Sequence, residues 1–420
     1  MNGLFGMEDI TKYVPGMLAG KELYSSMECL PMYNENIINM CQANRLVALN
    51  DIYKVYIPNE MSEEVYSKIY LAMLRSLQKK GSKLAIQQQN LNASKNLSVE
   101  AQGVIGGSDC FSIIGVSGIG KSAAISRAAS LISQRGVIEI ENPYIKVIPC
   151  ILVQTPFDCS SKGLMLEVLR VVDSYLETNY FEKAIRGRCT TDMMISSVAQ
   201  VLLNHVGVLI VDEIQNVVHH RKGRQLVSML TQLINSSGVS ICMVGTTEVE
   251  EFFSSVNYFA RRTLGLKYTT FEYGDYFKKF CETLFSYQYV KQRVDLTSDV
   301  VDWLYEHSNG TLALVVTILH DAQEIAILNG KERLDIEGLN QAYHQRMGMV
   351  QGFIQPSITK RPQTSSYVKK QIETPFVVFD EVEHEEDEVC LYSLAMKAKE
   401  SEEDVVEILS KYISIEEVAL

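Results

Sequence analysis

The nine cysteines of this sequence are scattered singly, their number is odd, and none belongs to a C-x-x-C pair. The sequence therefore lacks the paired spacing of a disulfide framework or a zinc site, which favours a reducing cytosol over secretion. Long apolar runs are also missing, since no stretch approaches the roughly eighteen apolar residues of a membrane span, and residues 1–17 contain Glu8, Asp9 and Lys12. These absences predict a cytoplasmic protein that is neither exported nor membrane-spanning.

The acidic charge is unevenly distributed. The 420 residues, of which 46% are hydrophobic, are enough for two or three domains with buried cores. The net charge of -12 argues against a nucleic-acid partner, but residues 353–420 hold 15 acidic and 7 basic residues and so account for -8 of it. Residues 1–352 carry only -4, which leaves room for a basic surface on the folded part of the chain.

Strand-length apolar runs alternate with helical stretches from about residue 100. Such alternation predicts an α/β domain in which a five-stranded parallel sheet has helices on both faces. Ligands of these sheets bind beyond the carboxyl ends of the strands. The five predicted strands are residues 111–115, 145–154, 207–212, 239–245 and 267–271.

The strand signals stop after residue 271, and a small helical domain is predicted there. Before the sheet, the chain is predicted to be mostly helical, with a strong helix at 62–80 that Ser62 caps. Prolines interrupt the chain after residue 352, and seven of the nine residues 380–388 are acidic, which indicates a linker and an acidic tail with one short helix at 402–412. The predicted helices of the small domain are 274–287, 298–309, 311–328 and 335–346. The predicted regions are 1–100, 101–272, 273–350 and 351–420.

Residues 115–122 read GVSGIGKS and fit the phosphate-loop pattern G-x-x-x-x-G-K-[ST] between a strand and a helix. The glycines allow backbone N–H groups to turn toward the phosphates, Lys121 reaches the β and γ oxygens, and Ser122 supplies a ligand to Mg²⁺. The loop predicts a nucleotide-binding protein. Its candidate nucleotide-binding residues are Gly115, Ser117, Gly118, Ile119, Gly120, Lys121, Ser122 and Ala123.

A second motif, VLIVDE at 208–213, has the form of a buried strand that ends in two carboxylates. Asp212 is predicted to bind Mg²⁺ and nucleotide together with Ser122, and Glu213 is predicted to polarise the attacking water. By itself the motif also fits a buried strand followed by a solvated acidic turn. Because it follows the phosphate loop by about ninety residues, the pair favours an ATPase.

Two further segments are candidates for the reaction. The strand at 239–245 ends at Thr246, whose hydroxyl is placed to contact the γ-phosphate or the water, although a threonine here also suits the cap of a helix at 248–254. The sequence FARR at 259–262 offers Arg261 and Arg262 as an arginine finger that reaches a neighbouring subunit's γ-phosphate. Ordinary surface arginines remain the alternative, and the pattern does not choose between the two.

This order of motifs resembles the AAA+ ATPases, and VDEIQN at 211–216 with VGT at 244–246 is most similar to the TnsC and TniB regulators of DNA transposition. The resemblance covers about residues 28–347. One departure is that GTLA at 310–313 contains no arginine, so no lid-domain arginine is assigned to the nucleotide. The other matching segments are LPMY at 30–33, VQTP at 153–156, SKGL at 161–164 and FARR at 259–262.

The resemblance implies an AAA+ core, a helical lid and ATP with Mg²⁺ as ligands. It also implies that the protein assembles with ATP into a ring or filament on duplex DNA. This assembly would mark a target site for the transposase, and ATP hydrolysis would then disassemble it. DNA contacts would be to phosphates and independent of sequence. The N-terminal region and the acidic tail would bind the transposase and target-selector proteins, although a solubilising tail is equally allowed. The DNA candidates are Lys162, Arg186, Arg188, Arg221, Lys222 and Arg224.

Two alternatives stay open at this stage. A replication initiator or helicase loader would share the motifs, but no winged-helix module is evident after the lid. A nucleotide-gated signalling switch would use the same ATPase without binding DNA.

Overall fold

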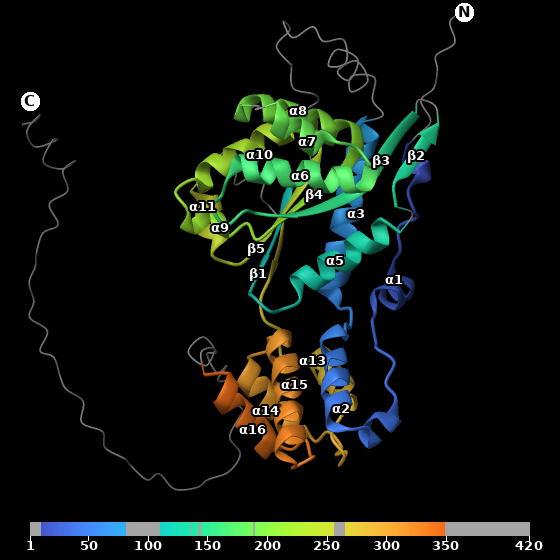
Figure 1. Ribbon diagram of the computed structural model, residues 1–420, viewed down its shortest axis with the longest axis vertical. Coiled ribbons are helices and arrows are strands. Elements are labelled where there is room, and N and C mark those ends of the chain that lie inside the picture. The colour runs from blue at the N-terminus through green and yellow to red at the C-terminus, as the bar shows by residue number, and fades with distance from the viewer. Residues whose placement is uncertain are drawn as a thin grey trace, which may run out of the picture. The chain divides into compact units, whose positions relative to one another are not determined.

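The computed structural model describes residues 10–80, 110–134, 136–141, 144–187, 190–255 and 265–348 (Figure 1). The chain divides into two compact units, Met1–Ile358 and Thr359–Leu420, and all described residues belong to the first. The predicted linker, acidic tail and helix at 402–412 therefore lie outside the described residues. Arg188, Arg261 and Arg262 lie outside them as well.

The sheet contains the five predicted parallel strands and one strand that was not predicted. Its order is β2-β3-β4-β5-β1-β6. The additional strand, β2, pairs with β3 in antiparallel fashion at the sheet edge, and all other pairings are parallel. The strands are β1 (Phe111–Gly115), β2 (Ile138–Glu141), β3 (Tyr144–Gln154), β4 (Val206–Asp212), β5 (Ser240–Gly245) and β6 (Leu266–Tyr268).

Both faces of the sheet are buried, which explains the unbroken apolar runs of the central strands. In β4, Val208 and Ile210 belong to the hydrophobic cluster on one face, while Leu209 and Val211 belong to the cluster on the other. This alternation follows from the two-residue period of a strand. The fold is therefore the α/β arrangement that the alternation of strands and helices predicted.

Helices cover the sheet on both sides (Figure 1). On one face lie α6 (Ser161–Leu176), α8 (Thr191–His205) and α10 (Gly223–Ser237). On the other face lie α3 (Glu60–Lys80) and α5 (Lys121–Ile132). The shorter helices of this domain are α7 (Tyr180–Arg186), α9 (Asn216–His219) and α11 (Val249–Ser254).

The helix predicted at 62–80 begins earlier, and its cap is a different residue from the predicted Ser62. The Ser62 backbone N–H donates to Asn59 Oδ1 (2.9 Å), and the Asn59 N–H donates to Ser62 Oγ (3.1 Å). Asn59 is thus the N-cap of α3, and Ser62 completes a reciprocal capping box from inside the first turn. The helix packs on the sheet, where Ser240 Oγ donates to the carbonyl of Ala72.

Four helices form the lid, with bounds close to those predicted. They are α13 (Asp275–Ser286), α14 (Ser298–Ser308), α15 (Leu312–Asn329) and α16 (Ile336–Arg346). Among the described helices, α15 alone is long and apolar enough by length and composition to cross a membrane, but 56% of it is buried inside the protein. It is the central helix of the lid core.

The N-terminal segment contributes to the lid as well as to the sheet domain. Its first elements are the 3-10 helices η1 (Ile10–Tyr13), η2 (Glu35–Asn39) and η3 (Asn50–Lys54) and the helices α1 (Gly20–Met27) and α2 (Gln42–Leu49). Leu49 and Ile52 are fully buried in the lid cluster. The chain then returns to the sheet through α3, so residues 10–80 bridge the two cores.

A buried ion pair fastens α2 to the lid. Arg45 is 2% exposed, and both of its terminal nitrogens donate to the Glu332 carboxylate at 2.6 Å. Arg45 also donates to the carbonyl of Tyr289 at 3.0 Å. The hydrogen bonds from Arg45 lower the pKa of Glu332 against a smaller opposing effect of burial. Such a bidentate pair fixes geometry as well as charge.

We expect Arg45→Ala to lower the free energy of unfolding by about 3 kcal/mol, because it leaves the Glu332 charge without its partner in a largely buried position. Because the folded-state pKa of Glu332 is lowered, the pair stabilises fully above the ordinary pKa of 4.5. That contribution disappears as the pH falls through the lowered folded-state value, so the difference from wild type should shrink in acid.

Denaturant unfolding of both proteins at pH 7 and in acid measures this effect. The matched control is Arg333→Ala, since Arg333 is half exposed and makes only a 3.8 Å pair with Asp335. An exposed pair of this kind is worth less than about 1 kcal/mol. Equal losses in the two variants would contradict the role given to the buried pair.

Candidate functional site

The phosphate loop joins the end of β1 to the start of α5, as predicted. Gly118 and Gly120 have φ of +81° and +98°, in the left-handed region that favours glycine. A Cβ atom on Gly115 would lie 2.7 Å from the Tyr268 carbonyl oxygen of the neighbouring strand β6. The glycines are thus required by backbone conformation and by close packing of the loop.

Lys121 is buried at the first position of α5, and its ammonium group folds back over the loop. Its Nζ donates to the carbonyls of Gly115 and Val116, both at 2.8 Å. Burial lowers the pKa of Lys121, and the charges of Asp212 and Glu213 oppose that shift. Phosphate oxygens can replace the two carbonyls as acceptors, which would favour the charged form of the amine.

Ser122 and Asp212 meet where a magnesium ion would be expected. Ser122 Oγ donates to Asp212 Oδ2 at 3.4 Å, and Asp212 Oδ1 accepts from the Glu213 backbone N–H at 2.8 Å. Asp212 is nearly buried at the end of β4. A hydroxyl and a carboxylate side by side, next to a phosphate loop, provide the hard oxygen ligands that Mg²⁺ prefers. The residues therefore fit the ion.

Glu213 projects from the sheet edge in a strained conformation. Its φ is +57°, which is unusual for a residue with a side chain. Its carboxylate is exposed and accepts a hydrogen bond from Gln215 Nε2, while Gln215 Oε1 is buried without a partner among the described residues. Gln215 belongs to the VDEIQN segment that carries the resemblance, but it was not predicted as a site residue, because the phosphate-loop and acidic-strand patterns assign no role to an amide at this position.

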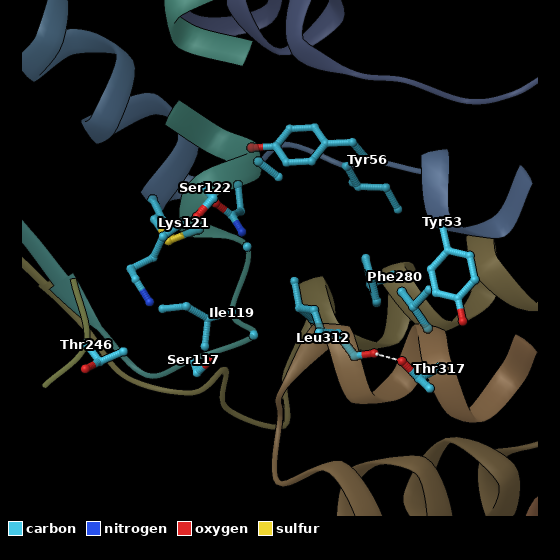
Figure 2. Close-up of a pocket in the computed structure, with 18 of the residues that line it drawn as sticks. Tyr53, Tyr56, Ser117, Ile119, Lys121, Ser122, Thr246, Phe280, Leu312 and Thr317 are labelled. Carbon is cyan, nitrogen blue, oxygen red and sulfur yellow. Dashed lines mark hydrogen bonds between the residues drawn. The ribbon is translucent and has the colours of Figure 1, made fainter. Parts of the chain in front are cut away.

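Thr246 follows β5 and lines the same cavity. Its hydroxyl oxygen is buried and has no hydrogen-bond partner among the described residues. The helix α11 has no side-chain cap, so the capping role that the sequence left open does not occupy this hydroxyl. A buried hydroxyl without a partner is costly unless a ligand completes it. Figure 2 shows Thr246 on the phosphate-loop side of the cavity.

The cavity has a volume of about 410 Å³, which suits a small-molecule ligand. One part is polar and holds residues 117–123 with Asp212, Glu213 and Thr246. The other part is apolar and comes from the N-terminal segment and the lid (Figure 2). Its main apolar residues, none of them predicted, are Val55, Ile57, Tyr276, Phe280, Leu312 and Val316.

The lid contacts the phosphate loop directly. The Ala313 backbone N–H in the first turn of α15 donates to the Gly118 carbonyl at 3.0 Å. A Cβ on Gly118 would lie 2.9 Å from Thr311 Cγ2 and 3.2 Å from Ala313 Cβ. The first turn of α15 thus meets the phosphate loop with backbone atoms and small side chains. Many AAA+ proteins have an arginine at this position of the lid.

The DNA candidates differ in their surroundings. Arg186 forms an ion pair with Glu182 at 2.9 Å, on the exposed surface of α7. The exposed side chains of Lys162, Arg221, Lys222 and Arg224 form no ion pair with a described carboxylate. Arg188 lies outside the described residues, as do the two finger candidates Arg261 and Arg262. Their assignments stay predictions.

Residues 100–272 match the family model of the bacterial TniB protein. No curated protein matches the chain. The match to the family model contains all six strands of the sheet together with the phosphate loop, Asp212, Glu213 and Thr246.

Solved structures also show similarity. The Aeropyrum pernix ORC1 protein in complex with DNA is 16% identical (TM-score 0.42) and covers 62% of this chain and 64% of its own. The Aeropyrum pernix ORC2 protein in its ADPNP-ADP complexes is 14% identical (TM-score 0.39), with coverage of 62% and 66%. Drosophila ORC bound to DNA is 12% identical (TM-score 0.40), with coverage of 96% and 83%. The chain thus spans slightly less than two thirds of the two Aeropyrum pernix proteins.

We expect Gly118→Ala to weaken binding of a slowly hydrolysed ATP analogue by about tenfold or more. The new methyl group meets the lid at Thr311 and adds left-handed strain of about 1–2 kcal/mol. Titration calorimetry measures the affinity.

The control for this variant is Gly330→Ala. Gly330 has a similar φ of +78° but no atom within 4 Å of the added methyl group. It should lose stability through the same backbone strain and keep its nucleotide affinity. A comparable loss of affinity in Gly330→Ala would show that strain alone, rather than the lid contact at Gly118, produces the effect.

Proposed function

We propose that this chain, whose residues 100–272 match the family model of the bacterial TniB protein, is an AAA+ ATPase that regulates DNA transposition. With ATP it assembles on duplex DNA, connects target selection to recruitment of the transposase, and disassembles when ATP is hydrolysed. The observation that carries this proposal is the convergence of Lys121, Ser122, Asp212, Glu213 and Thr246 on one end of a single cavity in a domain of this family.

ATP fits the two parts of the cavity. Its phosphates would accept hydrogen bonds from the loop N–H groups and from Lys121, and its base would pack against the apolar residues of the lid and the N-terminal segment. Ser122 and Asp212 would hold Mg²⁺, which neutralises charge on the β and γ phosphates. The Thr246 hydroxyl would donate to a γ-phosphate oxygen.

Glu213 would act as the residue that orients the attacking water. In the conformation described here its carboxylate is tied to Gln215. Release of that hydrogen bond would free the carboxylate to accept a proton from water beside the γ-phosphate. The hydrolysis step thus depends on a local rearrangement of the turn that follows β4.

Assembly would follow from an incomplete site. No described residue opposite Lys121 supplies an arginine to the cavity, and the finger candidates Arg261 and Arg262 precede β6 in the sequence. An arginine supplied by a neighbouring subunit would bind the γ-phosphate, so the interface would exist only while ATP is intact. Homo-oligomers in a ring or filament are the proposed form.

Contacts with DNA would be electrostatic and independent of sequence. The predicted candidates would bind phosphates, and among them Lys162, Arg221, Lys222 and Arg224 pair with no described carboxylate. The other two candidates are Arg186 and Arg188. The acidic tail would repel DNA, so a protein of the transposition machinery is its proposed partner. The N-terminal region is proposed to bind a further partner, and all of this would take place in the cytoplasm.

Electron microscopy with a slowly hydrolysed ATP analogue and a long duplex tests the proposal. We expect rings or filaments that require both nucleotide and DNA. Monomers under all conditions would contradict it. Assemblies that form with nucleotide alone, and do not bind DNA even at low salt, would support a signalling switch instead.

We expect Glu213→Gln to retain ATP binding, to reduce turnover by about a hundredfold, and to prolong the assembly on DNA. The amide keeps the size of the side chain but cannot accept the proton. Phosphate release and the lifetime of the assembly are the measurements. Glu248→Gln is the control, because Glu248 is an exposed carboxylate paired with His219 outside the cavity. Unchanged turnover in Glu213→Gln would remove Glu213 from this role.

We expect Arg261→Ala or Arg262→Ala to impair hydrolysis while nucleotide stays bound. A subunit with Lys121→Ala should bind no ATP but still offer its arginines. Mixing it with the arginine variant should restore part of the activity, because the two defects then lie on different sides of a shared site. Absence of rescue at every mixing ratio would contradict an arginine that acts in trans.

A further inference from the structure

Phe157 is a large apolar side chain that is 88% exposed. It lies in a tight turn after β3, which the Cys159 N–H closes by donating to the Pro156 carbonyl at 2.9 Å. Cys159 itself is buried, with a left-handed φ of +49°. The turn therefore holds the phenyl ring at its tip, in solvent, without help from packing of the ring.

The turn is fixed at both ends. On its far side, Ser160 caps α6 by accepting from the Gly163 N–H at 3.1 Å. On its near side, the Thr155 N–H donates to the Asp212 carbonyl at 2.8 Å, and the Thr155 carbonyl accepts from Asn216 Nδ2 at 3.0 Å. Because these hydrogen bonds already fix the backbone of the turn, little backbone freedom is lost when the ring binds a partner.

A group of cations lies beside the turn. Lys222 precedes Gly223, whose backbone packs against Val217 so closely that a Cβ there would lie 2.0 Å from the Val217 carbonyl oxygen. The neighbouring Asn216 donates to the Thr155 carbonyl at 3.0 Å, so Lys222 lies near the turn. Lys162 is exposed in the first turn of α6. Neither Lys162 nor Lys222 forms an ion pair with a described carboxylate.

The fold does not require these cations. Arg221, Lys222 and Arg224 surround the N-terminus of α10, where the helix dipole disfavours positive charge. Three cations that pair with no described carboxylate lower the local stability of the helix at that end. Their position is explained if they neutralise the charge of a bound anionic polymer.

A protein partner fits this surface poorly. The centre of a protein–protein interface is apolar over a wide area and depleted of lysine. Phe157 instead lies in a turn that leads into α6 with its exposed Lys162, next to an acid, Asp158, that accepts from the Ser160 N–H at 3.1 Å. An exposed apolar ring with cations nearby is found in proteins that insert a wedge into the minor groove of DNA.

We propose that Phe157 is the apolar contact of the DNA-binding surface, and this inference rests on the DNA binding proposed above. The ring enters the minor groove of the duplex and packs against sugars and base edges, while Lys162 and Lys222 bind the flanking phosphates. The contact is independent of sequence, because every base step offers an apolar face. It strengthens binding without adding a charge.

Fluorescence anisotropy of the full chain with a labelled duplex, a slowly hydrolysed ATP analogue and a series of salt concentrations tests the proposal. Phe157→Ala should weaken binding by about tenfold at every salt concentration. Its slope of log affinity against log salt should equal that of wild type, because no phosphate contact is lost. Lys222→Ala should weaken binding and reduce the slope by about one. Val47→Ala, at an exposed apolar residue of α2, should change neither quantity.

A second variant gives an independent measurement. The chain contains one tryptophan, Trp303 in the lid, so Phe157→Trp adds a second tryptophan, whose fluorescence reports on the turn. This variant should keep the affinity, and saturating duplex should quench the added emission. The inference is overturned if Phe157→Ala binds DNA as tightly as wild type, or if DNA leaves the emission of Phe157→Trp unchanged. In either case the wild-type chain and Lys222→Ala still measure DNA binding itself. Failure of the wild-type chain to bind any duplex would instead refute the proposed function.

Discussion

The pairing of β5 between β1 and β4 is the constraint on which the site depends. Met243 of β5 is in register with Ser112 on one side and Val211 on the other. Because all three strands are parallel, their carboxyl ends reach the same edge of the sheet. A slip of one residue in either pairing would move each side chain from the core on one face to the core on the other, where it does not fit. The packing that stabilises the sheet therefore also fixes the relative height of the catalytic candidates.

The sheet edge supplies only half of the cavity, and the N-terminal segment and the lid supply the rest. Residues 53–61 pass along the cavity between α2, which packs on the lid, and α3, which packs on the sheet. Arg45 and Glu332 hold the first of these contacts. The Ala313 N–H on the Gly118 carbonyl holds the lid against the phosphate loop. A change in lid position would therefore alter the base site and the phosphate site together.

The sequence predicted those parts of the protein that depend on short-range patterns. The phosphate loop, the acids after β4, Thr246 and the lid helices are each specified within a few neighbouring residues, and the structure has them near the predicted bounds. The sequence did not predict Val55 and Phe280 as cavity residues. These are ordinary apolar side chains more than two hundred positions apart, and they meet only in the folded chain. The edge strand β2 has only four residues, in which isoleucine alternates with glutamate, so its apolar pattern is weak. The cap of α3 was misassigned because Asn59 and Ser62 are both good capping residues, and the backbone geometry decides between them.

The proposed nucleotide site and the proposed DNA surface are joined through the end of β3. Gln154 is in register with Asp212, and the next residue, Thr155, donates to the Asp212 carbonyl and accepts from Asn216. The turn that carries Phe157 therefore begins one hydrogen bond away from the residue that is proposed to hold Mg²⁺. If ATP binds as proposed, a shift of Asp212 or Glu213 would act through these hydrogen bonds on the backbone that positions the ring. Coupling of this kind is reciprocal, so DNA that favours one position of the turn must also favour the nucleotide state that produces it.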